Sequence, residues 1–232
     1  MSGLDAIIDA EVNQNTRSYY IIQEYLKRVP VSTIIEIGAS SGGGTTEALI
    51  KGVLNSPSKG NGVRMASVEV SRARFKNLKE RYQDIPFFTP YNTSSVPLDK
   101  FPSDDDVRFF MKTTNVHGGN VTEVLKWLRQ DIKYVTDNGF NENGIQKIKD
   151  DFNVKSFSFA CIDGSEFTGE PEYNELHNCD AYFLDDIHVI KNWVPHRTLE
   201  KDINYVKLFQ EDIRGGSSLF CKKEIATKYF SN

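Results

Sequence analysis

The feature that most constrains this chain is a glycine-rich loop between two segments of different periodicity. The β-branched run Ser-Thr-Ile-Ile-Glu-Ile at 32–37 is followed by Gly-Ala-Ser-Ser-Gly-Gly-Gly at 38–44, and a helical pattern begins near Thr45. A buried strand, a loop of small residues and a helix, in this order, form the unit from which parallel sheets are built. The loop is therefore expected at the carboxyl end of a parallel strand.

The same alternation continues along most of the chain. Strands are predicted at 32–37, 64–70, 86–89, 156–162 and 181–184, and helices at 16–29, 45–53, 71–82 and 170–177. Short, continuously apolar runs are typical of parallel strands that are buried on both faces. The runs 205–209 and 217–221 flank Arg214-Gly-Gly and predict an antiparallel hairpin. The predicted fold class is α/β, a Rossmann-like doubly wound sheet that is mostly parallel and has an antiparallel C-terminal hairpin.

One stretch interrupts this alternation. From Leu98 to Asn120 the sequence is turn-rich and acidic, and a helical turn or two fits 142–151. Between them, one apolar helical face is formed by Val121, Val124, Leu125, Leu128, Ile132 and Val135. We interpret about 98–152 as a helical insertion within a single domain that spans 1–232.

The glycine-rich loop and an acid after the next strand predict a ligand with a ribose. Ligands of open parallel sheets bind beyond the carboxyl ends of the strands, where Gly38, Ser40 and Gly42 allow backbone N–H groups to approach closely. Glu69 ends the second strand beside this loop, and a carboxylate accepts two hydrogen bonds from a ribose diol. The alternative is a solvated glutamate beside an ordinary tight turn.

The spacing of the glycines excludes two common nucleotide sites. A dinucleotide site needs Gly-x-Gly-x-x-Gly, but Ser40 stands at its second glycine. A phosphate-binding P-loop needs Lys-Ser/Thr after its last glycine, but Gly43 is followed by Gly44 and Thr45. What remains is Glu-x-Gly-x-x-x-Gly over 36–42 with an acid at the end of the next strand.

Two further strand ends carry acids. Ile-Asp-Gly-Ser-Glu at 162–166 follows the fourth strand, and Leu-Asp-Asp-Ile-His at 184–188 follows the fifth. If these parallel strands are neighbours, Asp163, Asp185 and Asp186 converge, and clustered carboxylates suit Mg²⁺. Such an ion can hold substrate oxygens and lower the pKa of a hydroxyl group. The alternative is that these acids cap helices or orient a cofactor.

Together these motifs resemble class I S-adenosylmethionine-dependent methyltransferases, and the acidic segments resemble the catechol-O-methyltransferase-like and cephalosporin-hydroxylase-like family. The resemblance covers most of the chain outside the insertion. It implies S-adenosylmethionine as cofactor and Mg²⁺ or a similar metal bound by Asp163, Asp185 and Asp186. The cofactor residues that it implies are Gly38 and Gly42 in the loop, Glu36 near the methionine end and Glu69 on the ribose. Three further candidates follow from their positions: Ser40 in the same loop, Asn92 after the third strand for the adenine pocket, with an ordinary loop as the alternative, and Asp163 after the fourth strand, where the methyl group is expected.

The motifs do not specify a general base. In the catechol enzymes a lysine stands three residues after the first metal-binding acid, and in this chain that position is Glu166. His188 and Lys191 lie near the acidic pair, so that with Asp163 they are the candidate catalytic residues. For His188, a structural role is an equal alternative.

Charge and composition restrict the partners. The formal net charge is −4, and no basic patch is evident, so a nucleic acid is not an expected partner. No apolar run approaches the roughly 20 residues of a membrane span, and no membrane partner is expected. Cys161, Cys179 and Cys221 lie in apolar runs and are expected to be buried free thiols, which favours a cytoplasmic location.

The predicted function is methyl transfer from S-adenosylmethionine to an oxygen of a small molecule or a sugar, with or without Mg²⁺. One alternative is a metal-independent enzyme that methylates nitrogen or carbon. Another is a non-catalytic cofactor-binding or interaction module on the same fold. The sequence specifies neither the acceptor nor the oligomeric state.

Overall fold

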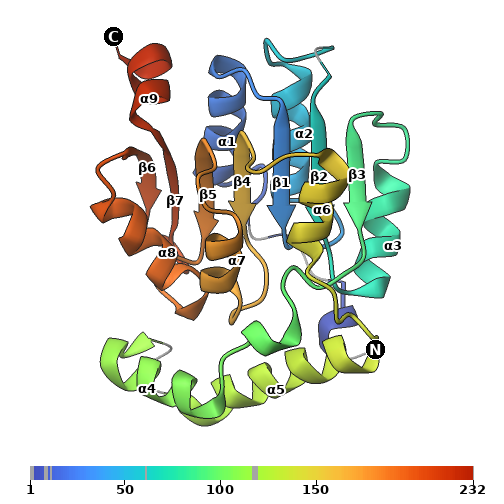
Figure 1. The fold of residues 1–232 in the computed structure, drawn as a ribbon, viewed down its shortest axis with the longest axis vertical. Helices are drawn as coiled ribbons and strands as arrows, with labels where there is room; N and C mark the ends of the chain where they lie inside the picture. The colour runs from blue at the N-terminus through green and yellow to red at the C-terminus, as the bar shows by residue number, and fades with distance from the viewer. Residues whose placement is uncertain (1–2, 8–9, 11, 61, 117–119, 232) are drawn as a thin grey trace.

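The computed structural model describes residues 3–7, 10, 12–60, 62–116 and 120–231, which contain a seven-stranded sheet of order β3-β2-β1-β4-β5-β7-β6 (Figure 1). The strands are β1 Thr33–Ile37, β2 Arg64–Val68, β3 Phe88–Tyr91, β4 Phe159–Ile162, β5 Ala181–Asp185, β6 Tyr205–Glu211 and β7 Ser217–Lys222. Strands β1 to β5 pair in parallel, and β7 is antiparallel to both β5 and β6. The predicted α/β class and the antiparallel hairpin are confirmed.

The order of the strands creates a crevice at the carboxyl end of β1. This strand has β2 on one side and β4 on the other, so the chain leaves β1 and β4 toward opposite sides of the sheet. A ligand site is expected at such a switch point. The residues that follow β1, β2 and β4 therefore surround one crevice.

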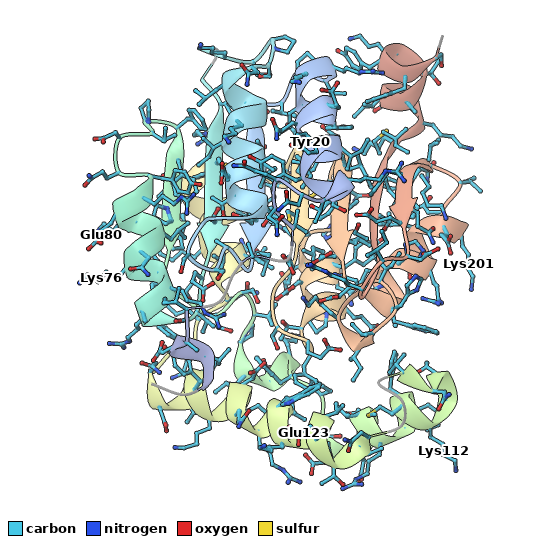
Figure 2. The ribbon with its side chains drawn as sticks, turned by 180° about the vertical axis from the view of Figure 1, so that it is seen from behind. Tyr20, Lys76, Glu80, Lys112, Glu123 and Lys201 are labelled. Atoms are coloured by element: carbon cyan, nitrogen blue, oxygen red, sulfur yellow. The ribbon has the colours of Figure 1, made fainter. Side chains whose placement is uncertain are left out.

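Helices cover both faces of the sheet. Helices α1 (Arg17–Arg28), α2 (Thr45–Leu54), α3 (Arg72–Arg81) and α9 (Lys223–Phe230) pack on one face, and α6 (Gly144–Phe152), α7 (Gly169–Glu175) and α8 (Ile190–Lys201) pack on the other. Figure 2 shows the first face, where Tyr20 on α1 and Lys76 and Glu80 on α3 point outward. Alternation along the chain thus produces three layers, as the sequence pattern indicates.

Two further helices lie beyond the carboxyl ends of the strands. They are α4 (Asp104–Thr114) and α5 (Val121–Asp137), which carry Lys112 and Glu123 at the lower edge of Figure 2. The prediction of a turn-rich stretch from 98 to 120 was wrong for α4. Ser103 forms a capping box with Asp106, and the acidic run at 104–106 is the first turn of the helix, where carboxylates stabilise the helix dipole.

The predicted insertion divides into two parts. Helices α4 and α5 lie beyond the sheet edge, and their small apolar cluster includes Phe167 after β4 and is packed by Ile190 and Trp193 of α8. Helix α6 packs against the sheet through Ile145, Ile148 and Phe152, so it is an ordinary connection between β3 and β4. The third strand begins two residues later than predicted and contains Pro90, which an edge strand tolerates.

The cysteines are buried and free, as predicted. Burial raises the pKa of the Cys161 thiol well above its ordinary value, which makes this group a poor nucleophile. Among the described helices, none combines the length and the apolar character that crossing a bilayer requires.

Candidate functional site

The glycine-rich loop passes between the ends of β2 and β4. Gly38 has a φ of +88°, and a Cβ added there would lie 1.9 Å from the backbone oxygen of Asp163. Only glycine allows this approach in this conformation. Ser40 also has a positive φ, of 50°, and its backbone N–H donates to Oε2 of Glu69 at 2.7 Å. The loop is thus fixed by β4 on one side and by the end of β2 on the other.

Glu69 joins the loop to the following helix. Its Oε1 accepts a hydrogen bond of 2.7 Å from the backbone N–H of Ser71, the N-cap of α3. The residue is 5% exposed, and burial raises the pKa of its carboxyl group. Each carboxylate oxygen has two acceptor sites, so Glu69 retains the capacity to accept ligand hydroxyl groups.

A cavity of about 250 Å³ lies at these strand ends. Of the predicted cofactor residues, Gly38, Ser40, Glu69 and Asp163 line it. Thr93, Ser94 and Ser95 after β3 form another part of the wall, and Leu4, Ala10, Val12, Phe101, Asp131 and Val135 line it as well. Leu4, Ala10 and Val12 therefore enclose the cavity together with helix α5 and the ends of the strands.

Three predicted cofactor residues lie behind the wall. The side-chain amide of Asn92 donates to the backbone oxygens of Glu69 at 2.7 Å and Val70 at 3.1 Å. The backbone oxygen of Gly42 accepts a 2.5 Å hydrogen bond from the Tyr82 hydroxyl. Asn92 and Gly42 thus shape the segments that line the cavity, and the third residue, Glu36, lies beneath the loop.

Glu36 is a fully buried carboxyl group. It accepts hydrogen bonds from the hydroxyls of Thr45 at 2.6 Å, Thr46 at 2.8 Å and Ser67 at 2.5 Å. Desolvation raises its pKa from 4.5 to about 7 even though these three hydrogen bonds oppose the shift. Glu36 therefore ties the first turn of α2 to β1 and β2 from inside the protein.

This pKa predicts a pH dependence of stability. Between pH 4.5 and about 7 the folded protein retains a proton on Glu36 that the unfolded chain has released. The free energy of unfolding is expected to fall as the pH rises through this window, by up to about 3 kcal/mol. Glu36→Gln removes the titration, so urea unfolding at several pH values should show this fall in the wild-type protein relative to the variant. Parallel pH profiles would contradict the prediction.

Asp163, Asp185 and Asp186 meet at the edge of the cavity. Each offers a carboxylate oxygen, and these atoms lie within 4.8 Å of one another. Asp186 has a left-handed φ of 60°, and a Cβ on Gly215 would lie 1.8 Å from Oδ1 of Asp186. The turn after β5 and the glycine before β7 together direct this carboxylate toward the other two.

Lys191 lies within the same cluster. Its Nζ donates to Asp186 Oδ2 at 2.7 Å and to Asp163 Oδ1 at 3.0 Å, and its side chain is only 9% exposed. Burial alone would lower the pKa of Lys191, but the charges of Asp163, Asp186 and Asp185 hold it well above its ordinary value. An ammonium group has no lone pair to accept a proton, so this placement argues against Lys191 as general base.

His188 and Glu166 face other partners. His188 is 38% exposed at its side chain, and its Nε2 lies 2.8 Å from Oδ1 of Asp212. The Glu166 carboxylate accepts a 2.9 Å hydrogen bond from the backbone N–H of Ile190, the first residue of α8. The residue that stands in place of the catechol-enzyme lysine thus satisfies a helix N-terminus.

Asp131 is a cavity residue that the sequence reasoning missed. It projects from α5, accepts a 2.6 Å hydrogen bond from the Ser165 hydroxyl, and has a pKa raised by burial. A signal was present, because Asp131 falls on the apolar stripe of α5 with Val124, Leu128 and Val135. An acid on a buried stripe indicates a polar surface opposite the helix.

A second cavity of about 220 Å³ adjoins the first. It is lined by Thr16, Arg17 and Ser18 at the start of α1, by Glu211, and by Arg214 and Gly215 before β7. Val12, Asp185 and Asp186 line both cavities. The acidic pair therefore lies at the boundary between the two cavities.

Comparison with known proteins gives the fold a context. An O-methyltransferase from Bacillus cereus, solved with S-adenosylhomocysteine (SAH), has a TM-score of 0.52 at 12% identity, over 95% of this chain and 84% of that protein. A Staphylococcus aureus protein provisionally assigned as a caffeoyl-CoA O-methyltransferase has a TM-score of 0.54 at 10% identity, over 94% and 85%. No family model and no curated protein matches the sequence. The chain has the Rossmann-like fold of class I methyltransferases.

Proposed function

We propose that this protein transfers the methyl group of S-adenosylmethionine to a hydroxyl group of a small polar molecule. The observation that carries the proposal is the pair of cavities that share Asp185 and Asp186. One cavity has the glycine-rich loop and the buried acid of a nucleoside site, and the other opens toward polar side chains. A methyl donor and an acceptor need this adjacency.

The cofactor occupies the larger cavity in this proposal. Glu69 accepts hydrogen bonds from the ribose hydroxyls, and Gly38 and Ser40 lie along the methionine part. Thr93, Ser94 and Ser95 face the adenine. The reactive end of the cofactor would then face Asp163, which also lines this cavity.

The acceptor approaches from the smaller cavity. Its oxygen forms a bond with the methyl carbon as the carbon–sulfur bond breaks, and SAH leaves as a neutral thioether. The hydroxyl proton passes to a carboxylate of the Asp185–Asp186 pair. Alignment of the two reactants can account for about 7–11 kcal/mol of the barrier.

The Mg²⁺ that the resemblance implies does not fit the residues as they stand. A divalent ion would have to share Asp163 and Asp186 with the buried ammonium of Lys191, which lies 3.0 Å and 2.7 Å from their carboxylate oxygens. The proposed transfer therefore uses the side chains alone. His188, which is bound to Asp212, takes no part in it.

The first test is calorimetric titration with S-adenosylmethionine and SAH, with NAD⁺ as the control nucleotide. We expect micromolar binding of the first two at one site, and none of NAD⁺, because the loop lacks the dinucleotide glycine spacing. Absence of binding would refute the proposal.

Transfer is tested with methyl-labelled cofactor and a panel of hydroxyl, amine and carbon acceptors. A labelled O-methyl product is expected. A labelled N- or C-methyl product would instead establish the alternative enzyme, and binding without transfer to any acceptor would favour a non-catalytic module.

A further inference from the structure

We propose that Lys191 takes the place of a divalent metal in the acidic cluster, so that the site carries its own cation. The catalytic consequence rests on the proposed function, whereas the occupancy of the cluster by Lys191 does not. The inference starts from the contacts of the ammonium group. It lies 2.7 Å from Asp186 and 3.0 Å from Asp163, and these acids are two of the three that offer clustered oxygens.

Contacts of helix α7 and of the two adjacent residues hold the backbone of Lys191 in place. A Cβ on Gly169 would lie 1.8 Å from the backbone oxygen of Lys191, so α7 packs directly against it. The backbone N–H of the preceding residue, Ile190, donates to the carboxylate of Glu166. The side-chain amide of the next residue, Asn192, donates to the backbone oxygens of Ile162 at 3.0 Å and Asp185 at 2.5 Å. These contacts tie Lys191 to the ends of β4 and β5.

The Lys191 side chain is largely buried within the cluster. It is 9% exposed, and its two carboxylate partners are 22% and 23% exposed. A metal among the same oxygens would lie close to this buried positive charge. Removal of the ammonium would take its positive charge away from these three clustered carboxylates. Repulsion between cations thus excludes the metal while Lys191 is present.

In the reaction, the ammonium performs the electrostatic part of a metal's role. It lies between the acid after β4, which lines the cofactor cavity, and an acid that lines both cavities. Negative charge develops on the acceptor oxygen as its proton leaves, and a preorganised positive charge stabilises it. Lys191 therefore acts as a fixed cation at the boundary between donor and acceptor.

The test measures Mn²⁺ binding to the whole protein by electron paramagnetic resonance. Carboxylate oxygens suit Mn²⁺ as they suit Mg²⁺. Lys191→Met removes the charge and keeps a side chain of similar length, and it is expected to tighten Mn²⁺ binding by about tenfold or more. Lys149→Met is the matched control, because Lys149 is also buried but donates to the backbone oxygen of Glu175. It should bind Mn²⁺ as weakly as the wild-type protein.

Addition of Asp185→Asn to Lys191→Met should abolish the gain, which would locate the ion in the cluster. If Lys191→Met does not fold, Lys191→Gln provides the same loss of charge. A wild-type protein that binds one Mn²⁺ as tightly as the Lys191 variants, or a folded variant that gains no affinity, would overturn the proposal. Neither outcome depends on cofactor binding, so failure of the methyltransferase assignment remains a separate result.

Discussion

Gly38→Ala is expected to lower the free energy of unfolding by about 2–5 kcal/mol and to weaken cofactor binding. The new Cβ would lie 1.9 Å from the backbone oxygen of Asp163, so two strand ends must separate. Overpacking of this kind costs about 1–3 kcal/mol, and the left-handed backbone adds about 1–2 kcal/mol for a residue with a Cβ. The backbone N–H of Asp163 also donates to Ile37 at 2.9 Å, a bond that this separation strains.

Gly139→Ala is the matched control for the backbone contribution. Gly139 has a φ of +72°, but a Cβ there would meet nothing within 4 Å. It should therefore lose only about 1–2 kcal/mol and keep its affinity for S-adenosylmethionine. Urea unfolding and calorimetry of the two variants separate strain from collision. Equal losses of stability in the two variants would show that Gly38 and Asp163 do not meet as the structure describes.

The strand ends were predictable because buried parallel strands appear in the sequence as short apolar runs, and because their carboxyl ends lie at the same edge of the sheet. Short apolar runs predicted β1, β2, β4 and β5, so the glycine-rich loop after β1 and the acids after the other three strands were expected at one edge of the sheet. The cavity lined by Gly38, Glu69 and Asp163 follows from that arrangement. Sequence periodicity predicts neither the path of a loop nor the direction of a side chain at the edge. For these reasons Gly42 and Asn92 were expected in the cavity, but they support its wall.

The position of the Lys191 ammonium among the three carboxylates was also not predictable from the sequence. Its position depends on the start of α8, whose helical pattern is weakened by Pro195 and by a non-helical backbone at Asn192. Without this helix the sequence places Lys191 near the acids but not among them. The role of Glu166 was likewise not predictable from the sequence. The resemblance marks it as a missing lysine, whereas the structure gives it a local task at the N–H of Ile190.

Glu69→Ala is expected to weaken S-adenosylmethionine binding by roughly 100-fold or more. Two ribose hydroxyls donating to a buried carboxylate form charge-assisted hydrogen bonds, each worth about 1.5–3 kcal/mol. The variant also removes the acceptor of two backbone hydrogen bonds, because the N–H groups of Ser40 and Ser71 each donate to the Glu69 carboxylate at 2.7 Å. Glu69→Gln keeps one acceptor oxygen and therefore only one of these two hydrogen bonds, so comparison of the two variants shows how far loosening of the loop contributes to the loss of affinity. Calorimetry supplies the affinities, and thermal unfolding supplies the stabilities.

Pairing the cofactor with an analogue makes this prediction specific. SAH that lacks both ribose hydroxyls should bind the wild-type protein far more weakly than SAH itself, whereas the Glu69 variants should barely distinguish the two ligands. Glu80→Ala is the control, because Glu80 is an exposed residue on α3 whose carboxylate lies 3.9 Å from Lys76 (Figure 2). It should discriminate as the wild-type protein does. If the Glu69 variants still distinguish the two ligands, other residues bind the ribose hydroxyls, and Glu69 only supports the glycine-rich loop.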